Sequence, residues 1–392
     1  MFKKIILGVM LLAATQAFTQ EIYDYASADS VTLKLYLEGN WRQLIRSGKQ
    51  ILKQNIEFKT LDQRIGYAYF KLSDYYKSKK YYEKALAFDA VDEITLLYLY
   101  YNGLNTGNKT YARYYEGKLP QATKGYLKSS QIRPVDAFDL EYNYKTASND
   151  LLEVRSAPDY KRMGINSQLG YKLNLYQTLS VYKQDVTAYD VYMYSTKQTE
   201  YFALLNITLT PKLNILGGYH YLHTKLDSVL YPGHIFLGKL RYNSGRWAAG
   251  VGISQFNSSF NNTFQTEAET GYMIPTNPGI YMGAKVTMQN EPDSVRWTYT
   301  GSAGIMLLKM FWIEGKVTLG AIKNYVDMDG LYVYNSIDPT YFRSGISLFW
   351  YTGKNITLYT NYTYDKKHYI IATDAVFDDL QHSFTGGIIW KL

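Results

Sequence analysis

The side chains best suited to catalysis or metal binding are five histidines, and their spacing builds no such site. His220 and His223 lie three residues apart in a stretch that alternates like a β-strand, so their side chains leave opposite faces and cannot share a metal. His382 and Ser383 are neighbours in another such stretch and diverge for the same reason. The chain has no cysteine, and it lacks the Gly-x-Ser-x-Gly and His-Glu-x-x-His motifs. We therefore expect no catalytic residue, no metal site and no cofactor.

Charged side chains offer a second kind of chemistry, the selection of solutes in a pore. They stand at alternate positions of strand-like stretches after residue 137, which puts them on one face of each stretch. Such a face either keeps a polar wall satisfied or serves as a selective lining, because rings of charge tune pores. Nine of these residues form two dense groups that we expect to line a lumen: Lys239, Arg241, Arg246, Glu267 and Glu269, and Arg296, Glu314, Lys316 and Arg343.

The elements that would carry these side chains are strands. Residues 354–366 show the pattern, with Ile356, Leu358 and Tyr362 on one face and Asn355 and Asn361 on the other. About 14 such stretches follow one another from residue 137, most of them 10–13 residues long, close to the ~9–11 that a tilted transmembrane strand needs. We therefore expect a transmembrane β-barrel rather than a soluble β-sandwich or propeller.

The connections between these stretches are alternately short and long. Outer-membrane barrels have short periplasmic turns and longer outer loops. The longer connections expected here include residues 148–161, 187–198, 323–339 and 367–379. Aromatic residues gather near both ends of the stretches, as in the two interfacial girdles of a membrane barrel.

The last stretch, residues 380–392, places Phe384, Ile388, Trp390 and Leu392 at alternate positions up to the C-terminus. It resembles the terminal signal by which outer-membrane proteins are recognised by their insertion machinery, although Leu392 stands where the usual signal has Phe. The resemblance implies this machinery, together with outer-membrane lipid, as partners.

The N-terminus is typical of a secretory signal peptide. Lys3 and Lys4 precede an apolar run over residues 5–14, and Thr15-Gln16-Ala17 offers a small-residue cleavage site. We expect residues 1–20 to be removed on export.

Residues 21–122 contain an internal repeat of 34 residues. The turn-like triplets that begin at Gly39, Ser73 and Gly107 are spaced by this period. The middle copy closely resembles the tetratricopeptide repeat, which implies pairs of antiparallel helices stacked into an extended concave surface for a protein or peptide partner. The residues that carry the resemblance are Gly39, Trp41, Leu44, Ile65, Gly66, Tyr69, Ser73, Tyr75, Ser78, Tyr82, Ala85, Gly107 and Ala112.

The net charge of +8 is not concentrated in either part of the mature chain. Residues 21–122 have 15 basic and 12 acidic residues, and residues 123–392 have 25 and 22. Neither part carries the basic stripe of a nucleic-acid binder, so we expect no nucleic-acid partner.

These features predict an α + β multidomain protein: a short tetratricopeptide-repeat helical stack followed by an antiparallel transmembrane β-barrel of about 14 strands. The expected boundaries are a signal peptide at 1–20, the repeat domain at 21–122, a linker at 123–136 and the barrel at 137–392. We expect it in the outer membrane of a Gram-negative bacterium, with the repeat domain and both chain ends in the periplasm.

This plan resembles that of outer-membrane proteins with tetratricopeptide repeats ahead of a C-terminal barrel, of which exopolysaccharide exporters are the best-known group. The resemblance implies a function in export or envelope assembly, with the repeats recruiting a periplasmic protein or peptide. A passive porin-like channel braced by the repeats is the alternative. A lipid-modifying outer-membrane enzyme is a more remote one.

Overall fold

The computed structural model describes residues 22–392 except 147, 150–152, 189–191, 260–261, 277, 309, 336–338, 354 and 371–375. The expected signal peptide, residues 1–20, lies outside the described residues. The chain divides into two compact units, the first ending at Gly107 and the second beginning at Asn108.

The first unit consists of helices whose ends keep the 34-residue period. Gly39, Ser73 and Gly107 each follow the end of a helix with a positive φ, of +68°, +60° and +71°. Two equivalent aspartates, Asp24 and Asp92, cap the helices that begin beside them by accepting a backbone N–H bond. The helices are α2 (Tyr25–Leu37), α3 (Trp41–Lys53), α4 (Lys59–Lys71), α5 (Tyr75–Phe88) and α6 (Glu93–Asn105).

Small residues let these helices pack closely. A Cβ atom at Gly66 of α4 would lie 2.9 Å from the ring of the buried Tyr82 on α5, so any side chain there would push the two helices apart. Leu44, Ile65 and Ala85 are fully buried in the stack. None of the helices in the described residues combines the length and apolarity of a bilayer-spanning helix.

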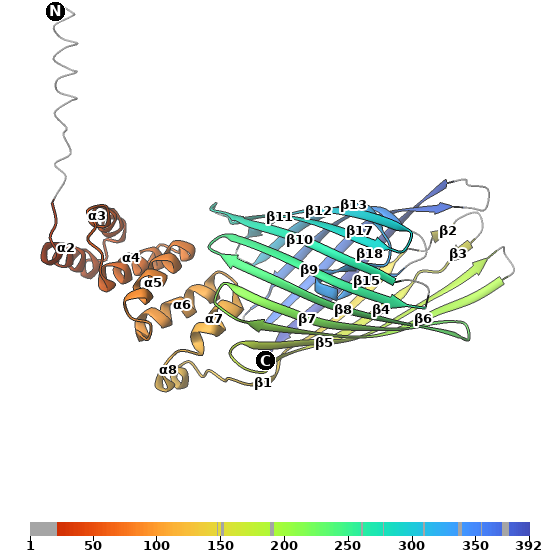
Figure 1. The fold of residues 1–392 in the computed structure, drawn as a ribbon, viewed down its shortest axis with the longest axis horizontal. Helices are drawn as coiled ribbons and strands as arrows, with labels where there is room; N and C mark the ends of the chain where they lie inside the picture. Colours follow the sequence, from red (N-terminus) through yellow and green to blue (C-terminus); the bar gives the residue numbers. More distant parts are fainter. Residues whose placement is uncertain are drawn as a thin grey trace, which may run out of the picture. The chain divides into compact units, whose positions relative to one another are not determined.

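The second unit begins with two short helices, α7 (Lys109–Glu116) and α8 (Gln121–Tyr126), and continues as a β-barrel (Figure 1). The barrel strands are β1 (Arg133–Lys145), β4 (Asp159–Gln168), β5 (Leu173–Ala188), β6 (Tyr192–Thr208), β7 (Leu213–Leu226), β8 (Val229–Ser244), β9 (Trp247–Ser258), β10 (Asn262–Ile274), β11 (Ile280–Glu291), β12 (Ser294–Leu307), β13 (Phe311–Ile322), β16 (Thr340–Tyr351), β17 (Ile356–Ile370) and β18 (Val376–Lys391). Two short strands, β2 (Ser148–Asn149) and β3 (Glu153–Arg155), extend the sheet beside β5.

The barrel is closed. Each of its strands pairs antiparallel with the strands before and after it, and β1 pairs with β18, where Leu140 is opposite Ile388. The sequence-based prediction of about 14 antiparallel strands that form a barrel is thus confirmed. Closure leaves no sheet edge, which is the condition for strands to cross a membrane.

The two faces of the barrel wall differ in polarity. Along β12, Trp297 and Tyr299 are exposed on the outside, while Thr298 and Thr300, which alternate with them, are buried on the inside. The same alternation places Phe384 and Trp390 of β18 on the outer surface. An apolar outer face with aromatic residues and a polar interior is typical of a transmembrane barrel.

The connection between β13 and β16 differs from its prediction as a longer outer loop. Residues 323–335, here called the lumen loop, fold back into the barrel interior (Figure 1). The loop contains β14 (Tyr325–Asp327), a turn of 3₁₀-helix (Met328–Gly330) and β15 (Tyr332–Tyr334), which pair as a small hairpin. The physical reason is that its carboxylates, tyrosines and backbone groups find partners on the inner wall, as described next.

Candidate functional site in the barrel lumen

A tight turn at the tip of the lumen loop aims two carboxylates at the barrel wall. Met328, Asp329 and Gly330 all have positive φ, of +49°, +56° and +90°. Gly330 is required there because a Cβ atom would collide with the Leu237 side chain of β8. The turn leaves Asp327 and Asp329 two residues apart, facing different parts of the wall.

Each of these carboxylates is held by two cations. The Asp327 carboxylate lies 2.6 Å from Lys285 Nζ and 2.8 Å from Lys316 Nζ. The Asp329 carboxylate lies 2.8 Å from both Lys239 Nζ and Arg241 Nη2. Because the lumen is partly shielded from water, these pairs are screened less than surface ion pairs.

Side chains of the barrel wall form hydrogen bonds with backbone groups of the lumen loop. The Gln265 side chain donates to the Val326 carbonyl at 2.8 Å and accepts from the Val326 N–H at 3.1 Å. Gln289 and Arg296 donate to the Lys323 carbonyl at 3.1 and 3.0 Å. Backbone groups that would otherwise face the lumen unpaired are thereby satisfied.

Tyrosines fix the returning half of the loop to strands β1 and β16 of the wall. The Tyr332 hydroxyl donates to the Glu141 carboxylate of β1 at 2.8 Å. The same carboxylate accepts from Arg162 at 3.0 Å and from Tyr359 at 2.7 Å. The Arg343 guanidinium lies 3.9 Å from the centre of the Tyr334 ring, a cation–π contact. The lumen loop therefore crosses the lumen rather than lying along one wall.

A histidine joins the tip of the loop to the wall. The buried His220 places Nδ1 2.7 Å from the Gly330 carbonyl and Nε2 3.2 Å from the Glu200 carboxylate. Val326 packs beside it against Leu222 and Ile235, in a small apolar cluster inside the lumen. The loop is thus anchored by packing as well as by charge.

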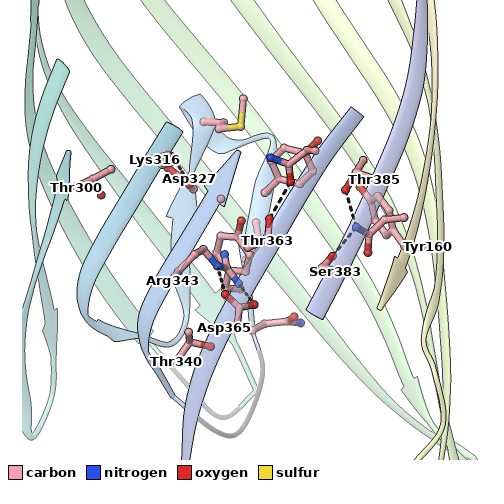
Figure 2. A pocket seen from close by; sticks show the side chains of 18 of the residues that line it. Tyr160, Thr300, Lys316, Asp327, Thr340, Arg343, Thr363, Asp365, Ser383 and Thr385 are labelled. Atoms are coloured by element: carbon pink, nitrogen blue, oxygen red, sulfur yellow. Dashed lines mark hydrogen bonds and ion pairs between the residues drawn. The ribbon is translucent and has the colours of Figure 1, made fainter. Parts of the chain in front are cut away.

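A cavity of about 1300 Å³ remains in the lumen beside the loop. On the β17, β18 and β1 side its wall includes several hydroxyl and amide side chains (Figure 2). Asn143 donates to Ser383 at 2.7 Å and to Thr385 at 2.6 Å, and Thr363 donates to Asn361 at 2.8 Å. This surface suits hydrated or hydroxylated solutes.

The nine residues expected in the lumen all lie on barrel strands or at a turn between them, and seven line the cavity. Arg246 is at the β8–β9 turn, and Arg296 is paired with Glu291 at 2.6 Å. The group on β8 and β10 makes direct contacts: Lys239 lies 2.8 Å from Glu267, and Arg241 lies 3.3 Å from Glu269.

The second group instead pairs with residues outside it. Lys316 binds Asp327, Arg343 binds Asp365, and Glu314 accepts a bond from Trp312 at 3.0 Å. Sequence reasoning missed the two loop aspartates, of which Asp329 binds Lys239 and Arg241 and Asp327 binds Lys316. The signal available was a pair of short alternating runs, Tyr325–Asp327 and Tyr332–Tyr334, separated by Met-Asp-Gly-Leu, which is a hairpin pattern.

Carboxylates of Glu267, Glu269 and Asp329 approach within 4.8 Å of one another. Lys239 contacts all three of them, at 2.7 to 2.8 Å. Arg241 also contacts Glu269 and Asp329, so the three carboxylates belong to an ion-pair network with these two cations.

The other predicted residues lie outside the lumen. In the helices, Ser78 and Ala112 are fully buried, and Trp41 packs edge-on against Tyr67 with ring centres 5.4 Å apart. Tyr69 is buried and stacks on Tyr81, whereas the Tyr75 ring meets Phe70 at the end of α4. In the last strand, Ile388 is opposite Leu358 of β17, and Leu392 is exposed at the barrel rim.

No protein-family model matches this sequence, and no curated protein matches it. Solved structures of other barrels are similar to part of it. The P. putida toluene transporter TodX is 7% identical over 66% of this chain and 91% of its own, with a TM-score of 0.46. A bacterial polysaccharide outer membrane secretin is 10% identical over 66% of this chain and 99% of its own, with a TM-score of 0.40. The KdgM porin in complex with disordered oligogalacturonate is 12% identical over 65% and 99%, with a TM-score of 0.32. These likenesses extend no further than a barrel architecture.

Proposed function

We propose that this protein is an outer-membrane channel whose bore is controlled by the lumen loop and whose helical unit binds a periplasmic protein, in export or envelope assembly. The observation that best supports a channel is the lumen loop itself. It spans a polar lumen, is held by side chains from many strands, and leaves a cavity beside it. A barrel that served only as an anchor would need neither a charged bore nor a loop folded into it.

The contacts of the loop favour release over permanent closure. They are ion pairs and hydrogen bonds to side chains, with a small apolar cluster and no covalent link, since the chain has no cysteine. Water and ions entering the lumen can replace such contacts one by one. The loop is therefore a constriction that an electrical potential, a solute or a bound partner can shift.

The partner role is supported by the surface of the first helices of the hairpins. Tyr36, Tyr67 and Tyr98 contact in turn across α2, α4 and α6, with ring centres 5.2 and 5.4 Å apart. Leu33 and Ile94 on the same helices are exposed. Tyrosine-rich surfaces with exposed aliphatic neighbours are common at protein interfaces.

The test of the channel uses the ion pairs of the loop. In planar bilayers, the full chain with Asp327→Asn and Asp329→Asn should open more often, or to a conductance several-fold higher, than the wild type. Asp293→Asn, at the exposed turn between β11 and β12, is the matched control and should behave as the wild type. Absence of conductance in all three proteins would refute the channel and leave an anchor.

A passive porin-like channel remains the second candidate, favoured by the cavity. It predicts that the helical surface has no partner. Site-specific crosslinkers placed at Leu33 and Ile94 in intact cells separate the candidates. A discrete crosslinked product that is lost with Tyr67→Glu supports the recruiting role, whereas no product from either position supports the porin.

A further inference from the structure

The cations on the side of the lumen where the loop is anchored are ion-paired, whereas two lysines on another side are not. Lys239, Arg241, Lys285 and Lys316 are each paired with a loop aspartate. Lys145 of β1 and Lys367 of β17 also line the cavity. Within the part of the chain that the structure describes, no carboxylate lies within ion-pair distance of either ammonium group.

The strand registers bring these two lysines to the same part of the wall. Lys145 is opposite Ser383, which is itself opposite Thr363, four residues before Lys367 on the same face of β17. The two ammonium groups repel each other, and Arg343 repels both. Arg155 of β3 also lines the cavity and repels Lys367. We call Lys145, Arg155, Arg343 and Lys367 the cation cluster.

The carboxylates nearest to Lys145 and Lys367 are engaged with other groups. Asp365 is bound by Arg343 through two contacts, of 2.6 and 2.8 Å. Glu200, which attracts Lys145, accepts bonds from His220 and from Gln198. Asp379, opposite Lys367, attracts that lysine, and Asp327 attracts Arg343. Lys145 and Lys367 therefore face the cavity with no carboxylate at ion-pair distance among the described residues.

The surface next to the cation cluster offers hydrogen bonds without charge. Thr363 lies near Arg343 and Asp365 in Figure 2, and Ser383 and Thr385 follow on the adjoining strand β18. Their hydroxyl groups donate and accept, as does the amide of Asn143. A solute at this wall can thus place an anionic group on the lysines and hydroxyl groups on the neighbouring side chains.

We propose that the cation cluster and the hydroxyl wall form a binding subsite for small hydroxylated anions that pass the lumen loop. This inference rests on the proposed channel and names its solute class. Lys145 and Lys367 bind the carboxylate or phosphate of the solute, because ammonium groups without a protein counter-charge are strong partners for oxyanions. Asn143, Thr363 and Ser383 bind its hydroxyl groups. The channel is accordingly anion-selective, as pores lined by lysine and arginine are.

The first test measures selectivity with the full chain in planar bilayers under a KCl gradient. The reversal potential of the wild type should report a chloride-to-potassium permeability ratio of about 3 or more. Lys145→Gln with Lys367→Gln should bring the ratio to about 1. The matched control is Lys161→Gln with Lys183→Gln, which removes the same charge from exposed positions on β4 and β5. This control should keep the ratio of the wild type.

The second test measures binding with gluconate and sorbitol, which share a hydroxylated six-carbon chain and differ in the carboxylate. Gluconate should reduce the chloride current of the wild type at concentrations at least about tenfold lower than sorbitol. The Lys145 and Lys367 double variant should abolish that difference. Equal block by the two compounds, or unchanged selectivity in the double variant, would overturn the subsite while leaving the channel intact.

A silent channel is a separate outcome. If neither the wild type nor the Asp327 and Asp329 variant conducts, the proposed function fails, and the subsite is then judged by thermal unfolding of the detergent-solubilised full chain. Gluconate should still raise the Tm of the wild type more than sorbitol does. No difference between the two compounds would refute the subsite as well.

Discussion

Two buried polar side chains show how single residues set the behaviour of the two units. In the helical unit, Asp62 is fully buried and neither of its carboxylate oxygens has a hydrogen-bond partner among the described residues. Burial, followed by the nearby Glu57 carboxylate, raises the pKa of Asp62 from 3.8 to about 7, against a smaller opposing effect of Lys84. The folded unit therefore holds a proton that the unfolded chain releases near pH 4.

The stability of the helical unit should accordingly fall as the pH rises from about 4 to about 7, and stay constant above that. Asp62→Asn should remove this dependence and raise the Tm of the helices at pH 8, by about 5 °C for each ~1 kcal/mol gained. Ellipticity at 222 nm in detergent follows the helices while the barrel stays folded. Asp89→Asn, at a carboxylate paired with Lys59, is the control and should retain the slope. An unchanged slope in the Asp62 variant would show that another group titrates.

In the barrel, His220 has an acceptor at each ring nitrogen. The Gly330 carbonyl can only accept, so Nδ1 donates to it, and the second bond needs a proton between Nε2 and Glu200. His220→Leu removes both bonds and should increase channel opening in bilayers by about tenfold if they stabilise the closed loop by ~1.4 kcal/mol. His223→Leu makes the same change at an exposed position and should have no effect. Equal opening by both variants would show that the tip of the loop is held without His220.

At the scale of elements, the periodicity of the sequence alone predicted most of the fold: a period of two residues in the strands and of 34 residues in the helices. The barrel strands follow from alternation because one face meets an apolar medium and the other a polar lumen, as Trp297 and Thr298 illustrate. The helix ends in the first unit follow from the 34-residue spacing of Gly39, Ser73 and Gly107. Both patterns are formed by residues near one another in the chain, so they can be recognised in a single sequence.

The position of the lumen loop was not predicted because it depends on contacts distant in sequence. Asp329 meets Lys239 from 90 residues away, and Tyr332 meets Glu141 from 191 residues away. Alternation assigned Lys239 and Arg241 to the lumen without indicating that a loop aspartate would join them. Two residues of the cation cluster could be predicted from the sequence. Lys145 and Arg343 follow from strand alternation, whereas Arg155 and Lys367 lie in segments that we expected to be loops.

The last strand supplies a test at this scale. β18 pairs with both β17 and β1, so deletion of residues 380–392 leaves two strand edges unpaired. Unpaired backbone groups cost several kcal/mol each in hydrocarbon, so the truncated barrel should not insert. Its band on gels should lack heat-modifiability, and urea should extract it from membranes. Leu392→Phe, which restores the usual terminal residue, should insert as the wild type does. A truncated chain that resists urea would mean that another strand closes the barrel.

At the scale of the whole molecule, the two units bury their cores in different ways. The helical unit has a compact core around Ile51, Leu61 and Ile65, whereas the barrel has a polar interior and exposes its apolar side chains outward. Each unit therefore has its own source of stability. The helices are stabilised by burying apolar side chains away from water, and the barrel by pairing all its strand edges within the lipid. If the helical unit only recruits a partner, the barrel should stay folded when the helical unit is lost. If the helical unit is a brace, the barrel should lose stability with it.

Ala85→Arg in the full chain separates these two possibilities. Ala85 is fully buried in α5, so arginine there places an unpaired charge in the core and should unfold the helical unit. Under the recruiting proposal, limited proteolysis should then remove the helices, the barrel should remain heat-modifiable and inserted, and the crosslinked product at Leu33 should disappear. Val91→Arg adds the same charge at an exposed position between α5 and α6 and should preserve both the fold and the crosslink. A barrel that fails to insert, or that melts at a lower temperature once the helices unfold, would instead identify the helical unit as a brace.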